Sequence, residues 1–190
     1  MKGDRLQRRT LLQAALAGWA LSLHSAGALA EEPAPPEVSA ALPQARLLGQ
    51  GRLRFIGLRV YEARLWTAAA ALPSEWLTVP LALDIRYERS LSGVQIAERS
   101  LAEMRRQGEI AEVLAASWLV QMKRLFPDVN SGTRLTGLNL NGAGLAFHVD
   151  GKAVGEVNDA EFARRFLGIW LSPQTSEPTL RAALLGRAPG

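Results

Sequence analysis

The chain lacks cysteine and has very little histidine. Its 190 residues include no cysteine, and the only histidines are His24 and His148. Disulfides, thiolate nucleophiles, iron–sulfur clusters and thiolate zinc sites are therefore excluded, and so is a metal site built from several histidines. Packing alone has to stabilise the core, which a domain of about 150 residues can achieve.

Basic clusters are scarce once the first thirty residues are set aside. The formal charge of +4 arises from 22 Lys and Arg against 18 Asp and Glu. Residues 1–30 hold four of the basic and one of the acidic residues, which leaves 18 against 17, a net charge of +1. No run of Lys or Arg remains that could follow a phosphate backbone, so nucleic-acid binding is not expected.

The first thirty residues show the three parts of a secretory signal peptide. A basic start that ends in Arg8-Arg9 precedes an apolar run from Leu11 to Leu23, and Ala28-Leu29-Ala30 follows. The run is shorter than the ~20 residues of a membrane-spanning helix. We therefore expect cleavage after Ala30 and a periplasmic protein without a stable membrane span, with an uncleaved anchor helix as the alternative. The paired arginines also fit a twin-arginine signal, so both export routes stay open.

The cleaved chain is predicted to consist of a leader and one domain. Residues 31–44 hold four prolines and no apolar periodicity, which is typical of a flexible spacer, and the domain is expected over residues 45–190. Residues 47–66 are rich in β-formers and predict two strands with a tight junction near Gly57. Apolar and polar residues alternate from Val79 to Tyr87, which predicts a half-buried strand.

The middle of the chain changes to helical spacing. Ser92 and Gln95 fit a capping box for a helix that ends at Gly108. A second helix is predicted over residues 109–126. Its expected apolar stripe consists of Val113, Leu114, Trp118, Met122 and Leu125.

The last third of the chain predicts strands and then helices. Asn141-Gly142 and Asp150-Gly151 separate three short segments, which indicates a three-stranded antiparallel meander. Asn158 is expected to cap a helix over residues 159–170, and Pro178 to begin a last helix that ends before Gly186. The whole order predicts an α+β fold, in which helices cover one face of an antiparallel sheet.

Few residues could carry out chemistry. His148 lies in a predicted strand and is either a solvent-facing residue or a base in a cleft. Ser117 lacks the G-x-S-x-G turn of a hydrolase, and Gly49-Gln50-Gly51 lacks the third glycine of a dinucleotide loop. The carboxylates of residues 98–112 alternate with arginines, as on a solvated helix face. No catalytic residue, cofactor or metal is therefore expected.

The first predicted strands carry a more informative group of residues. Arg52 and Arg54 lie two apart and share a face, close to Tyr61. An arginine inside an apolar cleft needs an anion, since an unpaired buried charge is costly, and a ligand carboxylate can be held bidentately. The alternative is surface arginines paired with Glu62 or Asp84. Tryptophans could also line an apolar pocket.

Several segments resemble the chalcone isomerase-like family. Residues 54–63, RFIGLRVYEA, resemble its paired strands with the G-x-x-V-Y core, and residues 91–99 resemble the entry to its first long helix. Residues 150–171 resemble its C-terminal hairpin and helix, and residues 184–186 its last turn. The resemblance covers about residues 45–187 and is closest to the exported bacterial branch. It implies an open-faced β-sandwich, a large antiparallel sheet with a layer of helices.

The resemblance also implies that the activity of the plant isomerases is absent. Those enzymes use a strand arginine, a strand threonine and a tyrosine near the first long helix. At the positions that match the threonine and the tyrosine, this chain has Ile56 and Ile96, which cannot donate the hydrogen bonds that cyclisation requires. Non-catalytic members resemble fatty-acid-binding proteins, in which an arginine and a tyrosine hold the carboxylate. Transferred to this chain, these are Arg54, or Arg52, and Tyr61.

The leading hypothesis is therefore an exported, non-catalytic protein that binds a small apolar ligand with a carboxylate, such as a fatty acid. One alternative is an isomerase or lyase for a small aromatic or enone substrate, which would use Arg54, Tyr61 or His148. Another is an envelope scaffold whose cleft is filled by its own side chains. A His148 that faces away from the cleft would argue against the enzyme, and a closed cleft would favour the scaffold.

Overall fold

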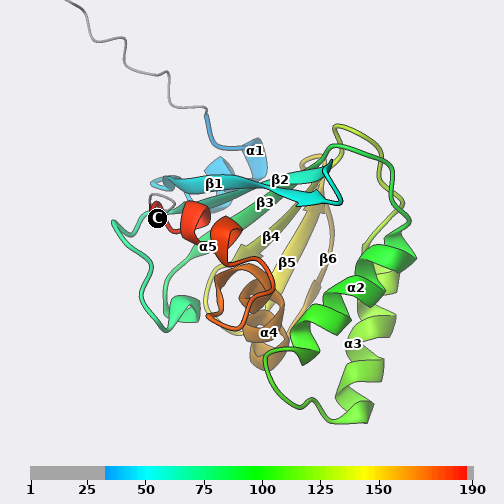
Figure 1. The fold of residues 1–190 in the computed structure, drawn as a ribbon. Helices are drawn as coiled ribbons and strands as arrows, with labels where there is room; N and C mark the ends of the chain where they lie inside the picture. The colour runs from blue at the N-terminus through cyan, green and yellow to red at the C-terminus, as the bar shows by residue number, and fades with distance from the viewer. Residues whose placement is uncertain (1–32, 188–190) are drawn as a thin grey trace, which may run out of the picture. The chain divides into compact units, whose positions relative to one another are not determined.

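A computed structural model describes residues 33–187; the predicted signal peptide, its cleavage site and the export route lie outside these residues. Six strands form one antiparallel sheet in which every strand pairs with its neighbours in the chain (Figure 1). The strands are β1 (Arg46–Phe55), β2 (Leu58–Thr67), β3 (Leu81–Tyr87), β4 (Arg134–Asn139), β5 (Leu145–Val149) and β6 (Lys152–Val157).

Helices lie on both faces of this sheet (Figure 1). They are α1 (Pro36–Ala41), the single 3₁₀ turn η1 (Trp76–Thr78), α2 (Gly93–Arg105), α3 (Glu112–Leu125), α4 (Ala160–Leu171) and α5 (Pro178–Leu184). The main hydrophobic core joins one sheet face to α2, α3, α4 and α5, whereas Val38 of α1 packs against Trp66 on the other face. The predicted α+β fold, an antiparallel sheet with a layer of helices, is confirmed.

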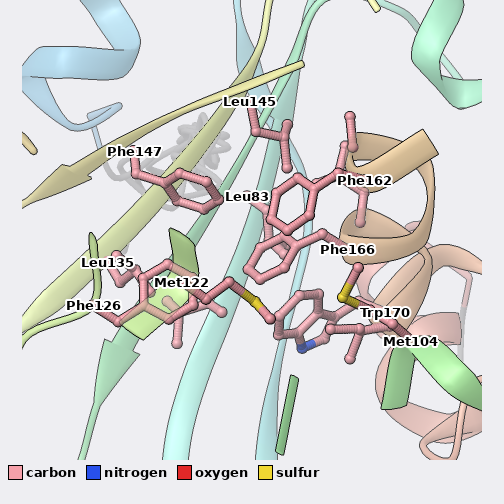
Figure 2. Close-up of a cluster of buried hydrophobic side chains, with 14 of the residues drawn as sticks. Leu83, Met104, Met122, Phe126, Leu135, Leu145, Phe147, Phe162, Phe166 and Trp170 are labelled. Atoms are coloured by element: carbon pink, nitrogen blue, oxygen red, sulfur yellow. The ribbon is translucent and has the colours of Figure 1, made fainter. Parts of the chain in front are cut away.

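Aromatic rings fill the core between the sheet and α4 (Figure 2). Phe147 of β5 lies 5.3 Å from the rings of both Phe126 and Phe166, measured between ring centroids. Phe166 also stacks on Phe162 at 5.5 Å and contacts Trp170 edge to face at 5.6 Å. Such pairs add about 1 kcal/mol each beyond the area they bury. The row of rings holds Trp170 at the edge of the core.

Two-residue turns close two of the hairpins. Asp150 and Gly151, between β5 and β6, have φ of +48° and +82°, as in the tight turn that the sequence predicts. Ile56 and Gly57, between β1 and β2, have φ of +49° and +77°. The two turns therefore share one left-handed geometry, although only the first has a residue that suits it at the first position.

The ends of two helices differ from the sequence prediction. Ser92 occupies the N-cap of α2, but its side chain makes no capping hydrogen bond, so the expected capping box is wrong. Asp128 replaces it: its Oδ1 accepts from the Gly93 N–H at 2.9 Å. At α4 the N-cap is Asp159 and not Asn158, and Asp159 Oδ1 accepts from two backbone N–H groups of the first turn.

The apolar stripe predicted for α3 is correct at three of its five residues. Trp118, Met122 and Leu125 are buried as expected. Val113 and Leu114 are exposed, and Ala115 takes the buried position of the first turn. The helix also begins at Glu112, three residues later than predicted.

Helix α1 replaces the middle of the expected flexible leader. Val38 is fully buried, and the buried carboxylate of Glu37 is hydrogen-bonded to two side chains of β4. Arg134 Nη2 donates to Glu37 Oε1 at 2.5 Å, and Thr136 Oγ1 donates to the same oxygen at 2.8 Å. These contacts span nearly a hundred residues of sequence, so the composition of the segment could not indicate them.

A buried ion pair continues this cluster into the sheet. Arg64 of β2 donates through Nε to Asp84 Oδ2 at 2.9 Å, and both side chains are almost completely buried. Thr136 Oγ1 lies 3.2 Å from the other oxygen of Asp84, which links the pair to Glu37. Charges buried at this depth require such partners.

Candidate ligand-binding cleft

A cleft of about 560 Å³ lies between the first three strands and helices α2 and α4. Most of its lining is apolar and comes from both layers of the fold. The apolar lining residues are Leu53, Phe55, Val60, Ile85, Leu91, Ile96, Leu135, Phe166, Ile169 and Trp170. A cavity of this size and character fits an elongated apolar molecule.

Strand register explains why two tyrosines face this cleft. Leu53, Tyr61 and Tyr87 are direct cross-strand partners on β1, β2 and β3, so their side chains point to the same face. Their row lies beneath α2, which contributes Ile96 and Glu103. The rings of Tyr61 and Tyr87 meet edge to face with centroids 6.1 Å apart.

The hydroxyl of Tyr61 has one fixed hydrogen bond. Trp170 Nε1 donates to Tyr61 Oη at 2.9 Å, and since an indole can only donate, the tyrosine oxygen is the acceptor. Within residues 33–187 the phenolic proton of Tyr61 has no acceptor of its own. Burial raises the pKa of Tyr61, and that of Tyr87, well above the usual value. Tyr61 is therefore a neutral donor aimed at whatever occupies the cleft.

Charged groups gather around Tyr61. Arg99 Nη2 lies 2.6 Å from Glu103 Oε1, and Arg106 Nε lies 3.5 Å from the other oxygen. Glu103 is buried, in contrast to the solvated face predicted for this helix, whereas Arg99 is 71% exposed. Glu177 also lines the cleft, so the charged groups that act on the phenol of Tyr61 are the carboxylates of Glu177 and Glu103 and the guanidinium of Arg99.

The structure brings only one of the three predicted ligand-binding residues to the cleft. Tyr61 lines it, but Arg52 and Arg54 do not. Leu53 and Phe55 point into the cleft, so the arginines that alternate with them point to the opposite face of the strand. Arg52 instead forms surface ion pairs with carboxylates of the neighbouring strand and loop, Glu62 at 3.3 Å and Glu88 at 3.2 Å.

Ile56 and Ile96, which replace the threonine and tyrosine of the plant isomerases, lie in different environments. Ile96 lines the cleft, at the helix position where the plant isomerases have tyrosine. Ile56 lies in the β1–β2 turn, is 84% exposed and does not line the cleft. The register of the threonine position is therefore not supported by the structure.

His148 lies on the sheet face opposite the cleft. It pairs in register with Thr136, whose hydroxyl contacts Glu37 of α1. Its Nδ1 is buried without a hydrogen-bond partner in the described residues. A base in this place cannot reach a molecule held beside Tyr61, and the outward orientation argues against the alternative of an isomerase or lyase that uses His148.

The described residues offer few other kinds of site. No helix within residues 33–187 is long and apolar enough to cross a membrane. The same residues contain no cluster of three His, Asp or Glu side chains that could hold a metal ion.

Comparisons with known proteins agree with this fold. A family model described as chalcone isomerase-like matches residues 35–186. An uncharacterised protein of Haemophilus influenzae is 30% identical over 108 residues, which make up 57% of this chain and 52% of the relative. The matched part thus spans about half the length of that curated relative.

A solved structure shares the fold. The crystal structure of a fatty-acid binding protein from Arabidopsis thaliana superposes with a TM-score of 0.59, over 75% of this chain and 87% of that chain. The two sequences are 13% identical, so the likeness shows the fold alone.

Proposed function

Because this chain belongs to the chalcone isomerase-like family, in which one fold hosts both catalysts and carriers, we propose that it is a non-catalytic binding protein. Its ligand is a long apolar molecule with a carboxylate head, such as a fatty acid. The tail lies in the cleft between β1–β3 and α2, and the head lies at Tyr61 and Arg99.

The single observation that carries this proposal is the hydroxyl of Tyr61. Its oxygen accepts from Trp170 Nε1, and its proton has no acceptor among residues 33–187, although the side chain lines a mostly apolar cleft. A carboxylate oxygen is the acceptor that completes this site. Arg99, which lines the cleft and acts on Tyr61, supplies the cation that can pair with this carboxylate. An open cleft of this size also argues against a scaffold filled by its own side chains.

Export is the second part of the proposal. The signal-peptide pattern of residues 1–30 supports a periplasmic site of action after cleavage behind Ala30. A periplasmic carrier would hold an apolar acid in an aqueous compartment.

Titration of the protein with fatty acids of increasing chain length tests the binding site. Tyr61→Phe removes one hydrogen bond to a charged head and is expected to weaken binding about tenfold. Arg99→Gln is expected to weaken it by a similar factor. The change in intrinsic tryptophan fluorescence reports binding, because Trp170 donates to Tyr61 at the cleft.

Two variants serve as controls for this titration. Arg105→Gln removes an arginine of the same helix that pairs with Glu112 outside the cleft, and affinity is expected to stay unchanged. Arg54→Gln tests the alternative in which that strand arginine holds the carboxylate. A loss of affinity in Arg54→Gln with none in Arg99→Gln would place the head group elsewhere and contradict the proposal.

A further inference from the structure

The tip of the β1–β2 hairpin exposes three large apolar side chains. Phe55, Ile56 and Leu58 are 63%, 84% and 57% exposed, and only Gly57 interrupts them. A soluble surface normally scatters such residues singly, and contiguous ones mark an interaction site. We define these residues as the hairpin tip.

The backbone at the hairpin tip makes the choice of isoleucine unusual. Ile56 has φ +49°, a region that β-branched residues strongly avoid. Asn, Asp or Gly suits the first position of this turn, and the turn between β5 and β6 uses Asp150 there. Neither the turn nor the core requires an apolar side chain at residue 56, since it extends into solvent.

Arginines surround the hairpin tip without carboxylate partners. Arg54 and Arg59 are direct cross-strand partners, both are exposed, and neither has an ion pair within residues 33–187. Like charges placed opposite each other destabilise a hairpin, and an anion between them reverses the effect. Arg89 follows Glu88, whose N–H donates to the Val60 carbonyl at 2.9 Å, so it lies at the same end of the sheet.

We propose that the hairpin tip docks onto a lipid surface that carries anionic headgroups. The three apolar side chains enter the boundary of the acyl chains, and Arg54, Arg59 and Arg89 contact the phosphates. Phe55 and Arg89 also line the cleft, so its mouth opens at the docked surface. Docking itself does not depend on the proposed function, whereas transfer of an apolar ligand from the bilayer into the cleft does.

Cosedimentation with vesicles tests the proposal. Residues 32–190 form a compact unit that holds every helix and strand found in the described part of the chain and both hydrophobic clusters, so this segment is used. Vesicles of phosphatidylcholine are compared with vesicles that contain one third phosphatidylglycerol. We expect the protein to bind the anionic vesicles and this binding to weaken as the salt concentration rises. Arg54→Gln and Arg59→Gln are each expected to weaken it about fivefold. Ile56→Asn is expected to lower the partition coefficient about tenfold.

Matched variants keep the result falsifiable. Val120→Gln removes another exposed aliphatic side chain, from α3, which is 68% exposed against 84% for Ile56, and its binding is expected to equal that of the unmodified protein. Ile56→Asn suits the left-handed turn, so its melting temperature is expected to stay the same or rise. Failure of the unmodified protein to bind anionic vesicles would overturn the proposal, as would equal losses in Ile56→Asn and Val120→Gln.

A second copy of the chain is the competing occupant of the hairpin tip. A concentration-dependent dimer that Ile56→Asn abolishes would assign the tip to self-association and overturn lipid docking. Fatty-acid titration of Ile56→Asn without vesicles is expected to match the unmodified protein, because Ile56 does not line the cleft. Loss of vesicle binding with intact ligand binding therefore separates docking from the proposed function.

Discussion

Glu37 is a carboxylate that the fold holds in its charged form. Its burial raises the pKa, but hydrogen bonds from its own backbone N–H and from Thr136, together with the charge of Arg134, outweigh burial and lower the pKa below the usual 4.5. A carboxyl group with a lowered folded-state pKa stabilises the fold above its unfolded pKa. That contribution is lost as the pH falls through the lowered value.

Substitution of Glu37 by Gln is therefore expected to destabilise the fold in a pH-dependent way. The loss should reach about 2–3 kcal/mol near neutral pH, because Arg134 loses a charged partner and Thr136 a strong acceptor. The difference from the unmodified protein should shrink below about pH 4.5. Thermal unfolding at a series of pH values measures it.

The control for this variant is Glu75→Gln, which makes the same charge change at an exposed residue without a side-chain hydrogen bond in the described residues. Its unfolding temperature should follow that of the unmodified protein at every pH. If the loss of stability in Glu37→Gln stayed constant into the acid range, Glu37 would stabilise the fold through packing and not through its charge.

The candidate site was only partly predictable from the sequence. The Val-Tyr pair led to Tyr61, which the structure places in the cleft. The arginines were assigned by proximity in the chain, whereas strand alternation turns Arg54 away from the cleft. Trp170 and Arg99 reach Tyr61 from α4 and α2, and contacts between separate elements leave no local signal.

Helix α5 packs against β1 through glycine. A Cβ atom at Gly49 would collide with the backbone carbonyls of Ala183 and Leu184, so the helix and the strand touch backbone to backbone. Gly51, on the same face, lies beneath Leu180. The Gly-x-Gly of this strand therefore provides close packing, which fits the absence of a dinucleotide loop.

Gly49→Ala is expected to displace α5 from the sheet. Overpacking of this kind costs about 1–3 kcal/mol, and amide exchange over Pro178–Leu184 should accelerate. Hydrogen exchange and thermal unfolding measure both effects. Gly137→Ala is the control, because a Cβ there meets only Phe147 at an ordinary 3.6 Å. Equal stability of the two variants would contradict the backbone contact between α5 and β1.

Elements with a strong local pattern were predicted well, and those fixed by distant contacts were not. The Asp150-Gly151 turn identified the β5–β6 hairpin. The alternation over Val79–Tyr87 located β3, but the predicted half-buried strand is wrong, since β3 is buried on both faces and Asp84 lies in the buried charge cluster. Helix α1 was missed because its prolines are typical of a spacer, and Glu37 and Val38 are held by residues far along the chain. The cap of α2 was missed for the same reason, since it comes from Asp128.

At the scale of the molecule, the sheet separates two environments. One face carries the cleft and the aromatic core, and the other carries the buried charges beneath α1. The charged face connects α1, β2, β3 and β4, which keeps the strands beneath the cleft in register. A binding protein benefits from such a division because the cleft can hold an apolar molecule without contact with the charged cluster.

The proposed carrier should retain its ligand during gentle purification. Native mass spectrometry of the protein released from the periplasm is expected to show added mass of one lipid or aromatic acid, which solvent extraction removes. The intact mass should correspond to a chain that begins at Glu31. Tyr61→Phe, purified in parallel, should carry less of this mass. Protein without added mass in every preparation would contradict ligand binding. Protein that keeps residues 1–30 would contradict cleavage of the signal peptide.

The two margins of the sheet differ in a way that bears on self-assembly. Helix α5 covers β1, while β6 is exposed along most of its length. Irregular pairing with β5 and a φ of +140° at Gly155 distort β6, and Lys152 begins it. A bent strand with a charged end is a poor template for another chain. Addition of a strand from another chain is therefore disfavoured at the β6 margin.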